Sequence, residues 1–433
     1  MKNKVRQLAV CMNGILVGHL EKSPRIGMSF CYADSWVNHI QSRPLSLAIP
    51  IRKKKYQGDL VYNFFDNLLP DNPQIRARLQ ARFQTLTDQP FDLLASIGKD
   101  CIGAIQLIDG NQIPENQSIQ AEVLTDSQIA SILRSYRVNP LGMNDDSDFR
   151  ISLAGAQEKS AFLWHHDQWC RPHGSTPTSH IFKLPIGTIA HQGLDLSNSC
   201  ENEWLCAQIL RAYNLPVAEC SISHFDDVKV LVVERFDRKY AADNTWLMRL
   251  HQEDMCQAMG YSPNLKYQAD GGPGIQQIMH LLLGSHQSLP DRRNFFKTQV
   301  LFWCLAAIDG HAKNFSVFIK RQGDYQSTPL YDVISAYPMI KNNQLQYQKI
   351  KMAMALQGKN KHYKLTTIQK RHFIQTAKTS KYSVKETEAI IEEIMQSMDD
   401  VIARVKAKIP ANFPQEIADS IFNGMLTFRE KLR

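Results

Sequence analysis

The hydrophobic pattern of the chain changes at about residue 250, and this change limits the possible folds more than any other feature of the sequence. Before it, short apolar runs alternate with turn-forming residues, a pattern typical of β-strands. After it, apolar residues recur every three or four positions, which is typical of helices. At 433 residues the chain exceeds what one hydrophobic core usually covers. We therefore predict an α+β protein with a β-rich N-terminal subdomain (residues 1–110), a second strand-rich part (111–245) and a helical part (246–433).

Composition and cysteine usage restrict the cellular setting. Hydrophobic residues make up 43% of the chain, but no apolar run reaches the roughly 18 residues that a transmembrane helix needs. The nine cysteines are scattered and include no C-x-x-C pair, so we interpret them as buried thiols in a reducing compartment. Residues 1–5 lead into a strand-like run rather than a signal-peptide core, and we expect a cytoplasmic protein. The net charge of +8 permits contact with nucleic acid but does not require it.

Local signals in the N-terminal part predict strands and helices but no chemistry. Asn13-Gly14 between two apolar runs predicts a β-hairpin with a type I′ turn. The runs at 28–32 and 45–49 predict further strands. Asn72, followed by a proline, predicts the cap of a helix over residues 73–83.

The stretch with the clearest chemical meaning follows a long apolar helix predicted over residues 291–307. Asp309 and Asn314 are five positions apart beside apolar runs, and Asp332 follows the next strand-like run. Two carboxylates and a carboxamide at neighbouring strand ends suit a magnesium-dependent phosphoryl transferase. One Asp accepts the proton of the attacking hydroxyl, while the Asn and the other Asp hold the metal. The spacing equals that of the protein-kinase catalytic loop, although the preceding His-Arg pair is missing.

Two stretches upstream contain candidate phosphate contacts. Residues 149–164 place small residues between strand-like runs, which lets backbone N–H groups face an anion. A tight hairpin turn is the alternative, because neither glycine-rich nucleotide-binding spacing fits.

Lys183 ends a second extended run, and Glu201 and Glu203 follow in the first turn of a predicted helix. A strand lysine on the α- and β-phosphates, steadied by a helix glutamate, is the arrangement of the kinase N-lobe. An edge-strand lysine and glutamates that stabilise a helix N-terminus are the alternatives. The sequence does not choose between the two glutamates.

Eight motifs in a fixed order carry a resemblance to a known family. They are Phe64–Asn72, Ile151–Lys159, Ser175–Pro185, Val233–Arg238, Gln252–Cys256, Asp270–Gly274, Asp309–Ser316 and Tyr331–Ser335. Together they resemble the HipA family, the serine/threonine-kinase toxins of bacterial type II toxin–antitoxin pairs. The resemblance extends from the first hairpin to the last helix. It implies a protein-kinase-like, two-lobed fold with an all-helical C-terminal lobe, and ATP and Mg²⁺ as cofactors.

The resemblance also implies roles for individual residues. Asp309 would be the catalytic base, Asn314 and Asp332 the magnesium ligands, and Lys183 the lysine on the phosphates. Ser152 matches the serine that such kinases autophosphorylate. Further predicted nucleotide contacts are the phosphate-covering loop (Leu153, Ala154, Gly155, Ala156, Gln157, Glu158 and Lys159), the adenine-reading hinge (Glu234, Arg235 and Phe236), and His311 and Lys313 beside the base. His311 fits a loop-bracing role as well as a role in proton transfer.

Partners follow from the same resemblance. They are a HipB-like helix-turn-helix antitoxin dimer, operator DNA through the antitoxin complex, and a protein substrate of the aminoacyl-tRNA synthetase class. Phosphorylation of that substrate would slow translation, and the complex would act as a repressor on the nucleoid. A small-molecule kinase, or a DNA-complex subunit with weak activity, remains the alternative, because a kinase-like fold also serves metabolites.

Overall fold

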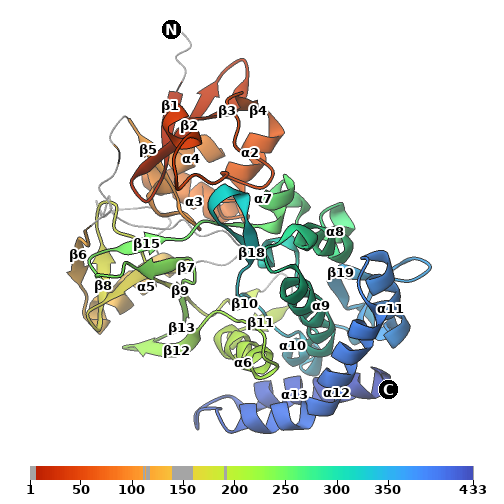
Figure 1. Ribbon diagram of the computed structural model, residues 1–433. Coiled ribbons are helices and arrows are strands. Elements are labelled where there is room, and N and C mark those ends of the chain that lie inside the picture. The colour runs from red at the N-terminus through yellow and green to blue at the C-terminus, as the bar shows by residue number, and fades with distance from the viewer. Residues whose placement is uncertain (1–5, 111–112, 114–117, 139–158, 190–192, 433) are drawn as a thin grey trace. The chain divides into compact units, whose positions relative to one another are not determined.

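The computed structural model describes residues 6–110, 113, 118–138, 159–189 and 193–432 (Figure 1). The chain divides into two compact units that alternate along the sequence. Unit 1 comprises Met1–Leu184, Ser223–Asn264 and Ser316–Tyr325, and unit 2 comprises Pro185–Ile222, Leu265–Phe315 and Gln326–Arg433. Both contain helices and strands, which confirms the predicted α+β class. The division into three parts at residues 110 and 245 stays a prediction.

The cysteines agree with their interpretation as thiols. All nine lie in the described part of the chain and outside any disulfide; seven are buried, and Cys31 and Cys220 are half-buried. None of the described helices is long and apolar enough to cross a membrane.

Unit 1 begins with a five-stranded antiparallel sheet. Its strands are β1 (Arg6–Met12), β2 (Ile15–Ser23), β3 (Gly27–Tyr32), β4 (Tyr56–Gln57) and β5 (Ile105–Asp109), in the order β4-β3-β2-β1-β5. Asn13 and Gly14 join the first two strands with φ angles of 48° and 78°, the positive values that a type I′ turn requires. The predicted hairpin is therefore confirmed.

The prediction of a strand over residues 45–49 was wrong. This run forms only a single bridge, between Ser46 and Ile49. Two of its N–H groups bind side chains instead of a neighbouring strand: Leu45 donates to the Tyr32 hydroxyl (2.6 Å) and Leu47 to the Glu253 carboxyl (2.8 Å). Tertiary partners from distant positions therefore override the local β pattern.

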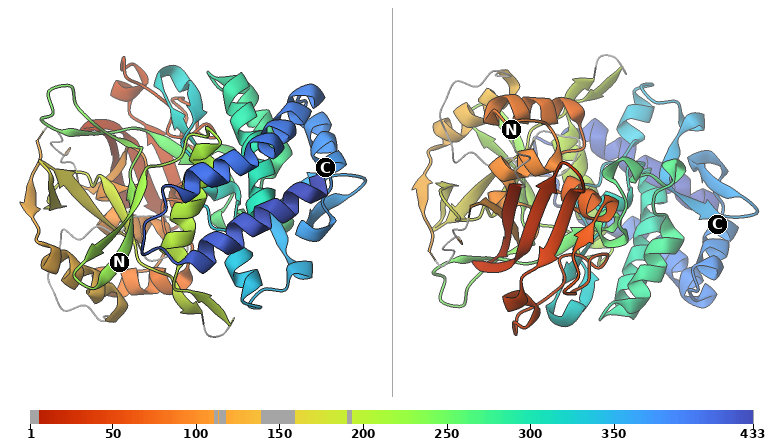
Figure 2. Two further views of the ribbon diagram at one scale, coloured as in Figure 1. Left: turned by 90° about the horizontal axis from the view of Figure 1, so that it is seen from below. Right: turned by 90° about the horizontal axis from the view of Figure 1, so that it is seen from above.

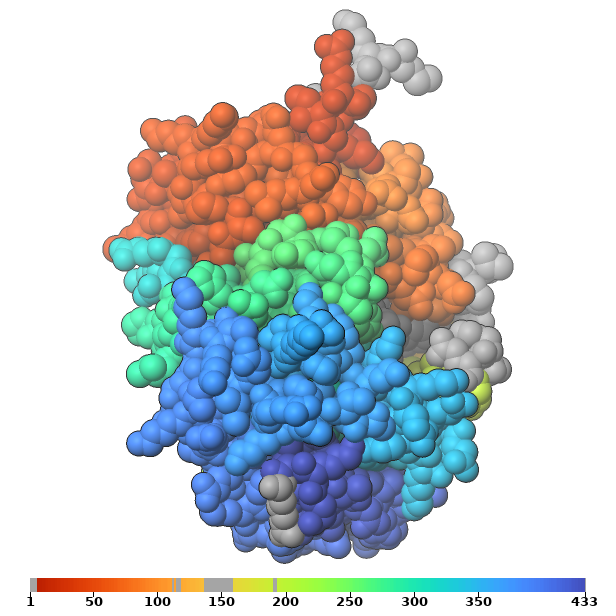
Figure 3. Space-filling model, turned by 90° about the vertical axis from the view of Figure 1, so that its right-hand side faces the viewer, coloured from red at the N-terminus to blue at the C-terminus, as the bar shows by residue number. Residues whose placement is uncertain are grey.

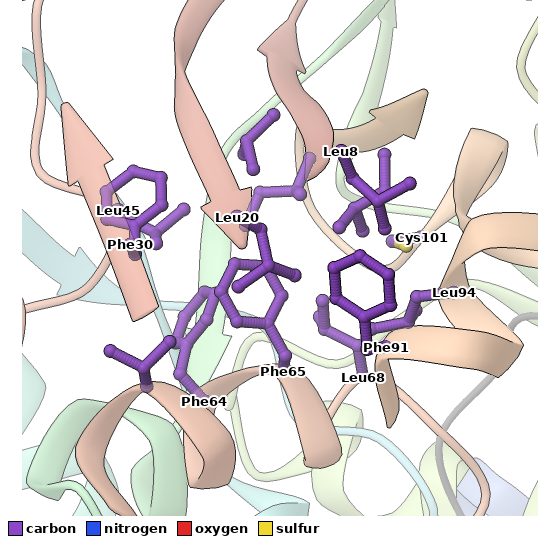
Figure 4. Close-up of a cluster of buried hydrophobic side chains, with 14 of the residues drawn as sticks. Leu8, Leu20, Phe30, Leu45, Phe64, Phe65, Leu68, Phe91, Leu94 and Cys101 are labelled. Atoms are coloured by element: carbon purple, nitrogen blue, oxygen red, sulfur yellow. The ribbon is translucent and has the colours of Figure 1, made fainter. Parts of the chain in front are cut away.

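Helices cover one face of this sheet and close the first core. They are α1 (Asp34–Val37), α2 (Asp59–Asp66), α3 (Pro73–Phe83) and α4 (Pro90–Ile97). Phe64 and Phe65 of α2 and Phe91 of α4 point toward the strand residues Leu8 and Leu20 (Figure 4). The predicted cap is also confirmed, because the Asn72 side chain accepts the N–H of Gln74 and Pro73 starts α3.

A second, six-stranded sheet carries the predicted lysine. Its strands are β6 (Ala121–Val123), β7 (Lys159–His165), β8 (Gln168–Pro172), β9 (His180–Lys183), β12 (Cys220–Phe225) and β13 (Val228–Glu234), in the order β12-β13-β9-β7-β8-β6. Helix α5 (Asp126–Val138) packs Ile129 and Leu133 against Phe162 and Phe182 of this sheet. Because β9 pairs with a strand on each side, Lys183 does not lie on an edge strand.

Shorter elements complete unit 1. They are β14 (Arg238–Tyr240), β15 (Leu247–Arg249), β16 (Gln252–Asp254), α7 (Met255–Met259) and β17 (Ser316–Ile319). Strand β18 (Tyr325–Ser327) begins at the last residue of unit 1 and continues in unit 2. β16 pairs antiparallel with β17, the strand that follows Asn314 in the sequence.

Unit 2 is mainly helical (Figure 2). Its helices are α6 (Ser199–Ala212), α8 (Ile275–Leu281), α9 (Ser288–Leu305), α10 (Tyr337–Lys341), α11 (Lys370–Thr379), α12 (Val384–Lys406) and α13 (Gln415–Leu432), and its strands are β10 (Gly187–Ile189), β11 (Leu194–Leu196), β19 (Lys351–Gln357) and β20 (Lys361–Lys364). Every residue of α9 from Phe295 to Leu305 is buried, and α6, α12 and α13 all pack against this helix. Segments 265–315 and 326–432 belong to this unit, and parts of both are visible in green and blue in the space-filling view (Figure 3).

Strands amend the expectation of an all-helical C-terminal lobe over residues 246–433. β15, β16, β17 and β18 lie within that range, and β19 and β20 form a hairpin there. The run Met352-Ala-Met-Ala-Leu356 consists of good helix formers, which is why the sequence favours a helix there. In the structure Ala353 donates its N–H to the carbonyl of Ile308 (3.0 Å), and Ala355 donates to the Gln268 side chain (2.7 Å). These neighbours hold the run extended.

Candidate active site

Unit 2 brings Asp309, Asn314 and Asp332 together through one side chain. Asn314 lies in the 3₁₀ turn Ala312–Asn314 and is only 6% exposed. Its Nδ2 donates to the main-chain oxygen of Asp309 (2.9 Å) and, at 3.5 Å, to that of Asp332. With the amide nitrogen used as a donor, Oδ1 is the atom of Asn314 that could ligate a cation. The carboxamide thus fixes both carboxylate-bearing residues beside one oxygen ligand.

The backbone at Asp332 is strained, and its neighbours hold it. Asp332 has φ +61°, a left-handed conformation that costs energy for a side chain with a Cβ. Just before it, the Tyr331 hydroxyl donates to the carbonyl of Lys313 (2.8 Å). Just after it, Asn202 of α6 both donates to and accepts from the backbone of Ser335, each at 2.8 Å. Strain that is fixed at both ends is a common property of functional sites.

Asp309 is exposed but its carboxylate is held by a tyrosine that we did not predict. The Tyr267 hydroxyl donates to Asp309 Oδ1 at 2.5 Å. The Tyr267 ring meets the ring of His311 edge to face, with 5.0 Å between centroids. The only signal in the sequence was the motif Asp270–Gly274, which lies three residues after Tyr267.

The residues between Asp309 and Asn314 are buried and tightly turned. His311 donates its main-chain N–H to the carbonyl of Asp309 (2.7 Å), and both His311 and Lys313 are buried. Gly310 has no room for a side chain, since a Cβ there would lie 2.4 Å from the ring of Phe302. The predicted nucleotide contacts of His311 and Lys313 stay predictions.

Lys183 belongs to unit 1, at the end of β9. It is 4% exposed and lies opposite Lys159 of β7 and Leu231 of β13. The glutamates predicted to steady it belong to unit 2, near the start of α6, where Glu201 lies in the first turn and Glu203 just after it. Glu201 and Glu203 are both buried there, so the choice between them stays open.

The three residues of the predicted adenine hinge, Glu234, Arg235 and Phe236, lie in different environments. Glu234 is the exposed last residue of β13, and Phe236 is half-buried, edge-on to Phe318 at 5.8 Å. Arg235 already has partners on its main chain: its N–H donates to Ser179 O (2.9 Å), and its carbonyl accepts from Arg238 N (3.1 Å). Its prediction as a nucleotide contact therefore needs correction.

The guanidinium of Arg235 lies in a buried ion cluster. It contacts Asp237 at 2.9 Å and Asp100 at 3.4 Å. Arg238 and Arg249 contact the same Asp100 at 3.0 Å and 3.3 Å. Removing one partner from such a buried cluster strongly destabilises a fold, so we assign Arg235 a structural role.

The remaining predicted residues lie outside the described part of the chain. They are Ser152, Leu153, Ala154, Gly155, Ala156, Gln157 and Glu158.

Comparison with known proteins identifies the family. The model of the HipA N-terminal domain matches residues 8–108, and the model of the HipA-like C-terminal domain matches residues 151–402. The chain belongs to the HipA family. The protein named "Putative kinase Y4mE" of Sinorhizobium fredii is 32% identical over 345 residues, 77% of this chain and 79% of that protein. The serine/threonine-protein kinase toxin HipA of Shewanella oneidensis is 26% identical over 306 residues, covering 67% of this chain and 66% of the toxin.

A solved structure shares the HipA fold of this chain. It is the complex of Shewanella oneidensis HipA and HipB with operator DNA, with a TM-score of 0.81 at 20% identity, covering 98% of this chain and 97% of the matched chain. The kinase-like fold class and the prediction of a protein kinase are confirmed by these relatives. This chain is a HipA-family kinase.

Proposed function

We propose that this protein is an ATP- and Mg²⁺-dependent serine/threonine kinase that acts as the toxin of a toxin–antitoxin pair. Its substrate is a component of translation, of the aminoacyl-tRNA synthetase class. The contact of the Asn314 carboxamide with the backbones of Asp309 and Asp332 supports this proposal most strongly. The test is to measure ATP consumption with a protein fraction and with a panel of metabolites. Stimulation by the protein fraction alone would distinguish this function from that of a small-molecule kinase.

The candidate site residues have distinct roles in the proposed reaction. The substrate hydroxyl gives its proton to Asp309 as its oxygen attacks the γ-phosphorus. Asn314 Oδ1 and the Asp332 carboxylate would hold Mg²⁺, and the bound ion would neutralise charge on the phosphates. These two groups suit that ion, because it prefers oxygen ligands and keeps positions for phosphate and water. Lys183 contacts the phosphates, Glu234 and Phe236 read the adenine, and the loop 153–159 covers the nucleotide.

Ser152 is proposed to be both the autophosphorylation site and a switch. A phosphate there adds about two negative charges next to the loop that receives the phosphates of ATP. We expect the phosphorylated protein to bind ATP more weakly than the unmodified one. Peptide mass spectrometry after incubation with ATP and Mg²⁺ should find phosphate at Ser152. The Ser152→Ala variant is the control and should keep its ATP affinity through the same incubation. An active enzyme without phosphate at Ser152 would contradict this role.

A basic segment of unit 2 supports the proposed complex with an antitoxin dimer and operator DNA. Residues 333–385 contain eleven Lys and Arg and no Asp or Glu, although the whole chain carries a net charge of only +8. All eleven cations are exposed. Parts of this segment lie on the face shown in Figure 3, in light blue. Exposed cations with no acidic residue among them suit the phosphate backbone of nucleic acid. On the nucleoid, the complex would act as a repressor.

Neutralising three of these lysines should weaken the DNA complex without affecting the fold. For the variant Lys359→Gln, Lys361→Gln, Lys364→Gln we expect a lower affinity of the toxin–antitoxin complex for operator DNA. Each lost phosphate contact reduces the slope of log affinity against log salt by about one. Gel shifts at several salt concentrations measure this slope. The control is Lys53→Gln with Lys54→Gln, from the exposed basic run of unit 1. Equal slopes for both variants would contradict a role of the segment.

A further inference from the structure

The motif Asp270-Gly-Gly-Pro-Gly274 has no role in the proposed reaction, yet it builds a turn around Tyr267. The N–H groups of Asp270 and Gly272 both donate to the carbonyl of Tyr267, at 3.1 Å and 3.0 Å. A Cβ at Gly272 would lie 1.7 Å from the carbonyl oxygen of Leu265, a clash with backbone that no small shift relieves. The glycine therefore lets the chain fold back tightly and fixes the backbone that carries Tyr267.

The residues on both sides of Tyr267 are bound to the rest of unit 2. The carbonyl of Lys266 accepts the N–H of Ala312, which lies between Asp309 and Asn314 (3.1 Å). The side chain of Gln268 accepts the N–H of Ala355 in β19 (2.7 Å). The turn is thus attached directly to the loop that contains the proposed base.

The ring of Tyr267 is oriented as well. It packs edge to face on the buried His311, and the Lys266 ammonium lies 5.6 Å from its centroid. The hydroxyl that this ring presents donates to Oδ1 of Asp309. A hydrogen bond to a carboxylate is among the stronger ones in proteins. It restrains an exposed side chain that would otherwise rotate freely.

We propose that Tyr267 is a positioning residue for Asp309, an inference that rests on the proposed kinase function. Tyr267 holds Oδ1, and this leaves Oδ2 to accept the substrate proton. In the reaction the substrate oxygen forms a bond to the γ-phosphorus and the bond from that phosphorus to ADP breaks. The proton of the substrate hydroxyl passes to Asp309, and Tyr267 keeps its own proton throughout. The turn of Asp270–Gly274 is the support that makes this contact rigid.

The variant Tyr267→Phe tests the proposal because it removes only the hydroxyl. The ring keeps its packing on His311, so the thermal unfolding midpoint should not change. We expect kcat for phosphoryl transfer to fall by about tenfold to a hundredfold, the effect of losing one hydrogen bond to a charged group. The KM for ATP should stay within about twofold, because a contact made to the base acts on the chemical step.

A double-mutant comparison separates positioning from a general structural effect. If Tyr267 acts through Asp309, then Tyr267→Phe should cause no further loss of kcat in the Asp309→Asn background. The matched control is Tyr62→Phe, which removes a tyrosine hydroxyl bonded to Gln89 in unit 1 (2.9 Å) and should leave kcat unchanged.

Two results would overturn the proposal. The first is a normal kcat for Tyr267→Phe when the wild-type protein is active. The second is a double variant whose loss of kcat equals the product of the losses of Tyr267→Phe and Asp309→Asn. A wild-type protein that transfers no phosphate would instead overturn the proposed function, and this inference with it.

Discussion

Replacing Asp309 with asparagine should lower kcat for phosphoryl transfer by about two to four orders of magnitude, the usual contribution of a general base. Asparagine has nearly the same shape but does not accept a proton at neutral pH. Its side-chain oxygen can still accept the Tyr267 hydroxyl, so the loop should keep its conformation. We therefore expect ATP to bind with unchanged affinity. Initial rates of phosphate transfer and calorimetric titration with ATP measure the two quantities.

The control for this variant is the same chemical change at a site with no role in the reaction. Asp400 of α12 is exposed and pairs with Arg404 one helical turn away. Asp400→Asn should have normal kcat and normal ATP affinity. A near-normal kcat for Asp309→Asn would exclude Asp309 as the base.

Replacing Asp332 with asparagine should reduce the dependence of ATP binding on Mg²⁺, because the variant loses the charged oxygen ligand. It should also lower kcat/KM by about a hundredfold or more, since a bound metal contributes several kcal/mol to the reaction. The backbone should be retained, because asparagine tolerates the positive φ angle of this position as well as aspartate does. Wild-type protein should bind ATP more tightly as Mg²⁺ is added, and Asp332→Asn should not.

Comparing the two variants separates the roles of the carboxylates. Asp309→Asn should keep the effect of Mg²⁺ on ATP binding, while Asp332→Asn should lose it. If Asp332→Asn bound ATP with the same response to Mg²⁺ as the wild type, the metal-ligand role of Asp332 would be wrong.

Residues close in sequence or placed at element ends could be predicted, while contacts between distant segments could not. Asn13-Gly14 and Asn72-Pro73 determine a turn and a cap through their own backbone preferences. The trio Asp309, Asn314 and Asp332 was recognisable because its members lie near the ends of consecutive apolar runs.

The misses arise from long-range contacts. Tyr267 lies 42 positions before Asp309, and no local pattern connects its hydroxyl to that carboxylate. Arg235 seemed to belong to the hinge, but its partner Asp100 lies 135 positions away. The run Lys351–Gln357 has helix-forming residues, but its pairing with β20 and its hydrogen bonds to Ile308 and Gln268 hold it as a strand.

The most direct test is the amount of phosphate bound to protein after incubation with ATP, with Mg²⁺ or with a chelator in its place. Wild-type protein and Asp309→Asn are treated side by side, and intact mass gives the number of phosphoryl groups. We expect wild-type protein to gain phosphate only when Mg²⁺ is present, and Asp309→Asn to gain none over the same time. Equal phosphate on both proteins, or phosphate gained without a divalent cation, would contradict a kinase site built from Asp309, Asn314 and Asp332.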